Sequence, residues 1–159
     1  MSSIKIGSMA IGSYQTNCYF VYREDSKRAV VIDPADNGAQ IYSALERNGF
    51  TVEAILLTHG HFDHIWGSNE LREVSGAKIY ALDEEKVLCE DVKYNLSAMV
   101  GRAYTVVPDE YVREGQVLTF DNMDFKVIAT PGHTIGSCCY YLEKAGILIS
   151  GDTLFQEST

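Results

Sequence analysis

Short apolar runs separated by polar turns divide the chain into predicted strands and helices. Runs rich in β-branched and aromatic residues predict strands, which are buried on one or both faces. These runs occupy residues 3–11, 17–24, 28–34, 52–58, 78–83, 115–120, 123–130, 137–143 and 146–152. Because the first three follow one another without an intervening helix, we expect them to pair as hairpins.

Other segments place their apolar residues at helical spacing. Helical patterns cover residues 37–50 and 63–76, and residues 84–101 are less regular and helical in part. In the first helix, Asn37 is a candidate N-cap and Gly49 is a stop signal. Strands mixed with helices predict an α/β fold in which helices cover sheet faces. With no linker or repeat visible, residues 1–159 are expected to form a single domain.

Composition and charge narrow the class of protein. The chain is 46% hydrophobic and 22% charged, as is typical of a globular domain, and no apolar run approaches membrane-spanning length. Its 13 basic and 22 acidic residues give a net charge of −9. Such a surface repels nucleic acid and anionic membranes, so we expect neither as a partner. The start of the chain shows no targeting signal, and we expect a cytoplasmic protein.

The four cysteines, Cys18, Cys89, Cys138 and Cys139, show no C-x-x-C spacing. Cys138 and Cys139 are neighbours in a predicted strand, where their side chains point to opposite faces and are poorly placed to bridge each other. We expect all four to be reduced and to pack in the interior, with a catalytic or metal role for the adjacent pair as the alternative.

Three predicted strands each end in a side chain that can bind a metal ion. "AILLT" runs into His59, "KVIAT" leads through Pro-Gly to His133, and "ILIS" leads through Gly to Asp152. Ligand sites in α/β sheets tend to form where strands end and loops begin. A glycine lies beside each of these positions and allows a tight turn: Gly60, Gly132 and Gly151.

Residues 58–67, "THGHFDHIWG", hold three of the four histidines in the chain. Neutral imidazole is a good zinc ligand, and the H-x-H spacing lets His59 and His61 reach one ion. Asp63 and His64 follow where a helix begins, point in another direction and suit a second ion. The alternative is a group of neighbouring histidines without metal. Their coincidence with the strand ends favours metal binding.

These sequence motifs resemble those of a known family. "THGHFDH" resembles the H-x-H-x-D-H signature of metallo-β-lactamase fold hydrolases, and "VVIDP", "TPGHTIGS" and "ISGDTLF" resemble its other motifs in the same order. Within that superfamily the chain is more similar to the glyoxalase II-like (hydroxyacylglutathione hydrolase-like) branch than to true β-lactamases. The resemblance implies an αββα sandwich. It is specific for the fold and for metal, and less so for the substrate.

The resemblance also implies a ligand set and a reaction. The first ion would be held by His59, His61 and His133, the second by Asp63 and His64, with Asp152 bridging both. Asp33 would orient histidine ligands, although a turn cap before Pro34 is equally consistent. Two divalent ions, zinc with iron or manganese as alternatives, would generate a bridging hydroxide that attacks a small-molecule thioester or related ester. His59, His61 and Asp63 would be the catalytic residues.

The chain departs from the family pattern near its end. Family members continue with a strand and helix that supply another histidine to the second ion, and glyoxalase II adds a helical region that binds glutathione. No histidine follows His133 here, so we expect the second site to lack one ligand and the sandwich to lack its C-terminal strand and helix. Because a strand pair cut off at its edge leaves backbone groups unpaired, we expect a truncated form of a longer protein.

Two alternative functions remain. A mononuclear iron enzyme, like the persulfide dioxygenases of the same fold, would use His59, His133 and Asp152. An inactive metal-binding fragment is the other alternative. The sequence carries no signal for an oligomeric state.

Overall fold

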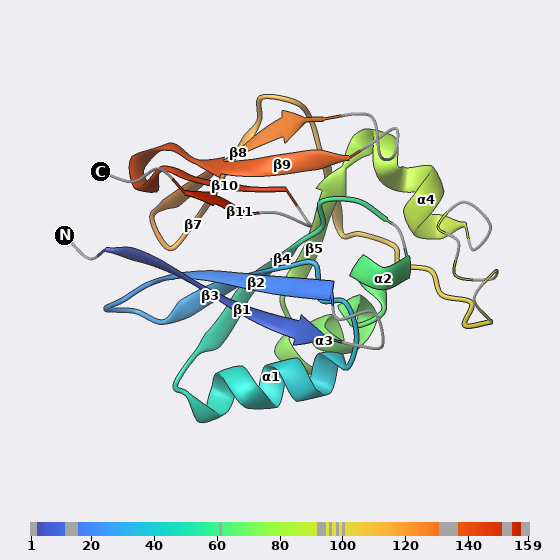
Figure 1. The fold of residues 1–159 in the computed structure, drawn as a ribbon, viewed down its shortest axis with the longest axis horizontal. Coiled ribbons are helices and arrows are strands. Elements are labelled where there is room, and N and C mark those ends of the chain that lie inside the picture. Colours follow the sequence, from blue (N-terminus) through green and yellow to red (C-terminus); the bar gives the residue numbers. More distant parts are fainter. Residues whose placement is uncertain are drawn as a thin grey trace.

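Two β-sheets stack face to face, and helices cover the outer face of one of them (Figure 1). The computed structural model describes residues 3–11, 16–60, 62–91, 95, 97, 99, 101–130, 137–150 and 154–156. Both sheets contain strands that the hydrophobic pattern predicts. The prediction of a mixed α/β sandwich is therefore confirmed.

The first sheet combines hairpins with parallel strands. Its strands follow the chain in order: β1 (Ile4–Ile11), β2 (Thr16–Arg23), β3 (Arg28–Ile32), β4 (Thr51–Leu56), β5 (Lys78–Leu82) and β6 (Glu110–Val112). β1, β2 and β3 pair antiparallel, as the pattern predicts, whereas β3 to β6 pair parallel. The sequence pattern did not predict β6, which is only 3 residues long.

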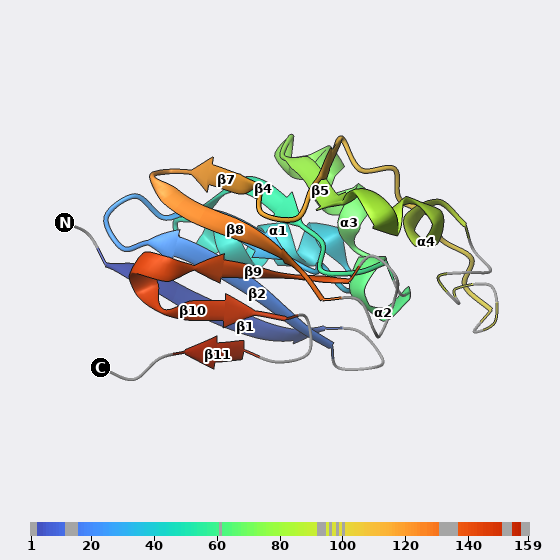
Figure 2. The same ribbon diagram turned by 90° about the horizontal axis from the view of Figure 1, so that it is seen from above.

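The second sheet is antiparallel throughout and lies across the first (Figure 2). Its strands are arranged in the order β11 (Leu154–Gln156), β10 (Ile147–Ile149), β9 (Cys138–Leu142), β8 (Met123–Ala129) and β7 (Val117–Phe120). A short 3-10 turn, η2 (Glu143–Ala145), joins β9 to β10. β11 is an element that the sequence pattern did not predict.

Two helices, α1 (Gly38–Arg47) and α3 (Ser68–Ser75), pack against the outer face of the first sheet (Figure 1). The shorter elements α2 (Phe62–Ile65), the 3-10 turn η1 (Asp83–Glu85) and α4 (Lys86–Glu90) follow the ends of β4 and β5. None of the described helices combines the length and apolar character that crossing a membrane requires. Among the described residues, no helix covers the outer face of the second sheet.

The single helix predicted at residues 63–76 is two helices, so this prediction is wrong in detail. α2 and α3 are separated at Trp66–Gly67, where the backbone N–H of Gly67 donates to the carbonyl oxygen of Pro34 at 2.8 Å. A Cβ on Gly67 would lie 2.9 Å from the carbonyl oxygens of both Pro34 and Asp36. The helix therefore breaks because a distant loop passes directly against it.

Asn37 occupies the N-cap position of α1, as predicted, but its side chain makes no capping hydrogen bond within the described residues. Its backbone is left-handed, with φ at 49°. The carboxylate of Glu70 in α3 instead accepts a hydrogen bond from the Ala39 backbone N–H at 2.6 Å. The helix start is therefore capped by a tertiary contact. At the other end, Gly49 adopts φ 84° and stops the helix as predicted.

Two hydrophobic cores hold these layers together. The core between the sheets includes the large, fully buried side chains of Phe125 and Tyr140. A second core fills the space between the first sheet and its helices, with Ile41 and Leu71 contributed by α1 and α3. Because β3 and the second half of β4 are covered on both faces, residues 29–32 and 54–56 are buried and apolar without alternation.

Candidate metal centre

The parallel strands of the first sheet bring their carboxyl ends to one edge. Ile32 of β3 lies opposite Leu56 of β4, which in turn lies opposite Tyr80 of β5. Asp33 therefore follows β3 at the same edge where Thr58 and His59 follow β4. Side chains that are 25 or more positions apart in the sequence meet there, as the strand-end argument predicts.

The Asp33 carboxylate contacts several of the residues at this edge. It is fully buried and holds an unusual left-handed backbone conformation, with φ at 55°. One carboxylate oxygen accepts a hydrogen bond from the Thr58 backbone N–H at 2.8 Å. The other oxygen accepts from the Thr58 hydroxyl and lies 3.0 Å from Nδ1 of His64. The geometry therefore favours the role of orienting a histidine over that of a simple turn cap before Pro34.

Hydrogen bonds orient both described histidines through the same ring nitrogen. Since the Thr58 hydroxyl donates to Asp33, its oxygen can accept from Nδ1 of His59, which lies 3.1 Å away. Nδ1 of His64 donates in the same way to the Asp33 carboxylate. A neutral imidazole protonated at Nδ1 carries its lone pair at Nε2, the form in which it binds metal. The two rings lie side by side, with centroids 4.0 Å apart.

Asp33, His59 and His64 together meet the geometric requirement for a metal site. Each offers a ligand atom, and these atoms all lie within 4.8 Å of one another. All three residues are buried, with exposed fractions of 0%, 4% and 1%. Buried imidazole and carboxylate groups are costly unless they are paired or bind a cation. Within this group Asp33 accepts the hydrogen bond that orients His64, and the imidazole nitrogens of the two histidines are donors that zinc and iron accept.

The other predicted ligands are less completely described. Asp63 lies in α2 next to His64, and only its backbone is described. His61, His133 and Asp152 lie outside the described residues. The assignment of six ligands to two ions therefore stays a prediction, of which the structure brings together His59 and His64.

The ends of β8 and β9 that flank residues 131–136 are hydrogen-bonded to each other. The backbone N–H of Thr130 donates to the carbonyl oxygen of Ser137 at 2.8 Å. The next residue, Cys138, donates its backbone N–H to the carbonyl oxygen of Thr58 at 2.9 Å. The second sheet is therefore attached to the first directly beside His59.

Gly60 is needed here for close packing. It is not among the described residues with positive φ, but a Cβ on Gly60 would lie 3.0 Å from the Leu88 Cβ and from the Cys89 backbone nitrogen. Helix α4 therefore packs against Gly60, the residue that follows His59. Gly132 and Gly151, predicted to play the same part, lie outside the described residues.

Two polar residues of this edge were missed by sequence reasoning. Thr58 links Asp33 to His59, and Glu85 accepts a hydrogen bond from the Gly60 backbone N–H at 2.8 Å. Thr58 stands directly before the histidine cluster in the sequence. Glu85 follows the strand "KIYAL", so the rule that polar groups at strand ends form sites would have included it.

The cysteines are packing residues, as predicted. All four are free and buried. Burial raises the pKa of the Cys18 thiol well above its usual value, and the nearby Asp33 carboxylate raises it further. Burial likewise raises the pKa of Cys138 and Cys139. Protonated, enclosed thiols are poor nucleophiles, so the geometry does not support a catalytic role for the adjacent pair.

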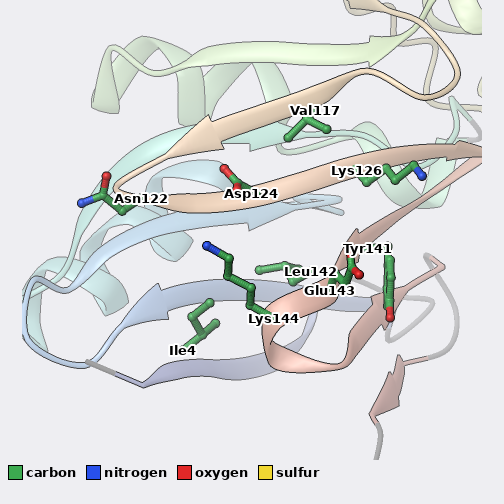
Figure 3. A pocket seen from close by; sticks show the side chains of 9 residues that line it. All are labelled: Ile4, Val117, Asn122, Asp124, Lys126, Tyr141, Leu142, Glu143 and Lys144. Carbon is green, nitrogen blue, oxygen red and sulfur yellow. The ribbon is translucent and has the colours of Figure 1, made fainter. Parts of the chain in front are cut away.

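A well-defined cavity of about 160 Å³ lies away from this edge (Figure 3). Its lining includes Asn122 in the turn between β7 and β8 and Lys144 in the turn between β9 and β10. These turns are at the opposite ends of the strands from Thr130 and Cys138, which adjoin the metal edge. This cavity is therefore not the substrate pocket of the candidate centre.

The chain belongs to the metallo-beta-lactamase superfamily, whose family profile matches residues 11–159. Among curated proteins, YqgX of Bacillus subtilis (strain 168), named a "probable metallo-hydrolase", is 37% identical over 150 residues, which are 93% of this chain and 70% of YqgX. The hydroxyacylglutathione hydrolase GloC of Haemophilus influenzae is 28% identical over 156 residues, covering 96% of this chain and 73% of GloC.

Solved structures agree with this assignment. The crystal structure of the BLEG-1 B3 metallo-beta-lactamase superposes with a TM-score of 0.87 at 36% identity and covers 96% of this chain and 74% of that chain. The structure of TTHA1623 in a di-iron-bound form gives a TM-score of 0.78 at 30% identity over 96% of this chain and 75% of that one. Both support the fold described above.

Proposed function

We propose that this protein is a metal-dependent hydrolase that cleaves a thioester of a small acyl group, in the manner of hydroxyacylglutathione hydrolases. Relatives named as a metallo-hydrolase and as a hydroxyacylglutathione hydrolase support both the reaction class and the substrate class. The net charge of −9 favours a small molecule over nucleic acid as the partner. A cytoplasmic location is part of the same proposal.

The observation that carries the proposal is the pair of oriented, buried histidines. His59 and His64 come from a strand end and a helix, and hydrogen bonds to Thr58 and Asp33 hold Nδ1 of each ring. A structural role alone does not require both rings to present the same nitrogen at one edge. Ligands held in this way bind metal tightly because little reorganisation is needed.

The chain would hold two divalent ions through the predicted ligands. These are His59, His61 and His133 for the first ion, Asp63 and His64 for the second, and Asp152 for both. Zinc is the proposed metal, and the di-iron form of TTHA1623 makes iron the main alternative. When bound, such ions supply Lewis acidity, which polarises a carbonyl and acidifies water.

The protein groups contribute orientation and proton management. Asp33 and Thr58 hold Nδ1 of His64 and His59 through hydrogen bonds, so both rings stay in a fixed orientation. Asp63, one residue before His64, is the proposed acid–base group that orients the attacking water. The low exposure of the edge excludes bulk water and strengthens these interactions.

Hydrolysis of S-lactoylglutathione tests the proposal. We expect the protein purified with zinc to hydrolyse it, to lose activity with a chelator, and to regain it when zinc is restored. His59→Ala should reduce kcat/KM by about 100-fold or more, because it removes a proposed ligand of the metal ion that would acidify the attacking water. Lys144→Ala, in the distant turn beside the cavity of Figure 3, is the matched control and should leave kcat/KM unchanged.

Metal analysis of the same preparation separates the alternatives. About one iron per chain, with oxygen consumed in the presence of glutathione persulfide, would replace the hydrolase by a dioxygenase. Stoichiometric metal without any turnover of thioester or ester would identify a metal-binding protein that lacks hydrolase activity.

A further inference from the structure

The end of β5 places a buried acidic side chain beside the metal-binding turn. Glu85 is the last residue of η1, and only 1% of its surface is exposed. Its Oε2 accepts a hydrogen bond from the Gly60 backbone N–H at 2.8 Å. Gly60 is the single residue between His59 and His61. A carboxylate from the 3-10 turn that follows β5 therefore binds the backbone between two predicted ligands.

The segment that carries Glu85 also presses on the same turn. α4 begins directly after Glu85, and a Cβ on Gly60 would lie 3.0 Å from the Leu88 Cβ and 3.1 Å from the Cys89 sulfur. Gly60 is thus confined by packing from α4 and by the hydrogen bond that its N–H donates to η1. Packing limits how far the turn can move outward, while the hydrogen bond sets the direction of its peptide plane.

A hydrogen bond of this kind has a large effect on its surroundings. A carboxylate acceptor makes a stronger bond to a backbone N–H than a neutral oxygen does, and burial strengthens it further. The peptide plane at Gly60 sets the directions in which the chain leaves towards His59 and His61. Metal ligands must be held within about 0.5 Å of their productive positions, so a displaced peptide plane lowers metal affinity.

We propose that Glu85 is a positioning residue of the metal centre, which orients the backbone at Gly60, directly after His59, by accepting the Gly60 N–H hydrogen bond. It acts through the backbone of the ligand turn. The inference rests on the metal dependence of the proposed function and is independent of the substrate. Removing a group that supports metal ligands typically weakens metal binding by about 10–100-fold.

Two conservative substitutions separate the effect of the length of the Glu85 side chain from the effect of its charge. Glu85→Asp keeps the charge but withdraws the carboxylate by one methylene, whereas Glu85→Gln keeps the length and an acceptor oxygen but loses the charge. Zinc alone is the probe, and the affinity of the metal-free full chain for its first equivalent is measured by competition with a chromophoric chelator. We expect Glu85→Asp to weaken binding by about 10–100-fold and Glu85→Gln to weaken it less.

The exposed neighbour Glu84 provides the matched control. Glu84→Asp and Glu84→Gln change the same groups on the same turn, and we expect both to bind zinc like the wild type. Glu85→Asp with wild-type affinity would overturn the proposal. A larger loss in Glu85→Gln than in Glu85→Asp would also overturn it, because charge and not the hydrogen bond would then be the cause.

Hydrogen exchange supplies a readout without metal or turnover. In the metal-free protein, the Gly60 amide should exchange faster in Glu85→Asp than in the wild type, while amides in the core of β4 keep their protection. Unchanged exchange at Gly60 would contradict the positioning role. If thioesters are not hydrolysed but these effects on zinc affinity and exchange occur, the proposed substrate is wrong and the inference on Glu85 stands.

Discussion

Asp33 shows how much one residue can organise at this edge. Its carboxylate serves the backbone and the hydroxyl of Thr58 and Nδ1 of His64, and its own backbone is left-handed. Aspartate tolerates this conformation better than most residues because its short polar side chain can bond locally. Both properties are required at once, which limits the residues that can replace it.

Asp33→Ala should therefore destabilise the fold as well as the site. It leaves the buried Thr58 N–H and the His64 Nδ1–H without their acceptor and places a Cβ-bearing apolar residue at a positive φ. We expect a loss of roughly 3 kcal/mol in the free energy of unfolding, from about 1–3 kcal/mol for each unsatisfied buried group. Urea denaturation of the metal-free protein measures it. Asp25→Ala, at an exposed position, should change stability by less than about 0.5 kcal/mol.

At the scale of elements, residues 101–109, which precede β6 and are called the return segment below, contact the helical layer. The Arg102 guanidinium donates to both carboxylate oxygens of Asp36, at 2.8 and 2.7 Å, and lies 4.3 Å from the centre of the Trp66 ring. Trp66 in turn donates its indole N–H to the Arg102 carbonyl oxygen. This contact joins the loop before α1, the break between α2 and α3, and the return segment, all close to the metal edge.

The Asp36–Arg102 pair predicts an acid dependence of stability. The hydrogen bond from Arg102 holds the pKa of the Asp36 carboxyl below its ordinary value of 3.8. A carboxyl with a lowered pKa stabilises the fold fully above its ordinary pKa, and this contribution is lost as the pH falls towards the lowered one. Because the pair is partly exposed, Asp36→Asn should lower the free energy of unfolding by only about 1 kcal/mol at pH 7. At the acid end of the transition the carboxyl is protonated in the wild type as well, so the substitution should cost nothing there.

Urea unfolding at pH 7 and in steps from pH 5 to about pH 2 measures this difference. A constant difference between wild type and Asp36→Asn across that range would contradict the prediction.

The fluorescence of Trp66, the only tryptophan, gives an independent signal, since Arg102→Ala exposes its ring. The emission maximum should shift to longer wavelength in that variant and stay unchanged in Arg113→Ala, an exposed arginine of the following loop.

For the whole molecule, the geometry of the sheet edge that carries Asp33 and His59 depends on how the two sheets are attached to each other. Tyr140 lies in the core between the sheets, fully buried, and its hydroxyl donates to the carbonyl oxygen of Leu57 at 2.5 Å. The Cys138 backbone N–H donates to the Thr58 carbonyl oxygen close by. Strand β9 is therefore hydrogen-bonded to the residues that immediately precede His59, and stability and site geometry share these contacts.

Tyr140→Phe should lower the free energy of unfolding by about 1–2 kcal/mol, because it removes one buried hydrogen bond without changing the packed ring. Thermal and urea unfolding of the metal-free protein measure the loss. Tyr141→Phe is a matched control, since Tyr141 is only partly buried and faces away from the core, and it should change stability by less than about 0.5 kcal/mol. Equal effects of the two variants would contradict this account of the sheet attachment.

Much of the fold could be predicted because the relevant signals are local. The strands from β1 to β5 lie within a residue or two of their predicted positions, since alternation and apolar runs depend on near neighbours along the chain. β6 and β11 were missed because each is 3 residues long and includes a polar residue, whereas the equally short β10 is a continuous apolar run. The break between α2 and α3 was missed for another reason: it depends on Pro34 and Asp36, far away in the sequence.

The sequence by itself determined the chemistry available at the edge, because the ligand types and their spacing in residues 58–64 are properties of one continuous segment. Only the tertiary structure decided how that chemistry is held. The hydrogen bonds from His64 to Asp33 and from Gly60 to Glu85 join segments 31 and 25 positions apart. Such contacts depend on which strands lie side by side in the sheet, and the spacing within a single motif carries no information about that.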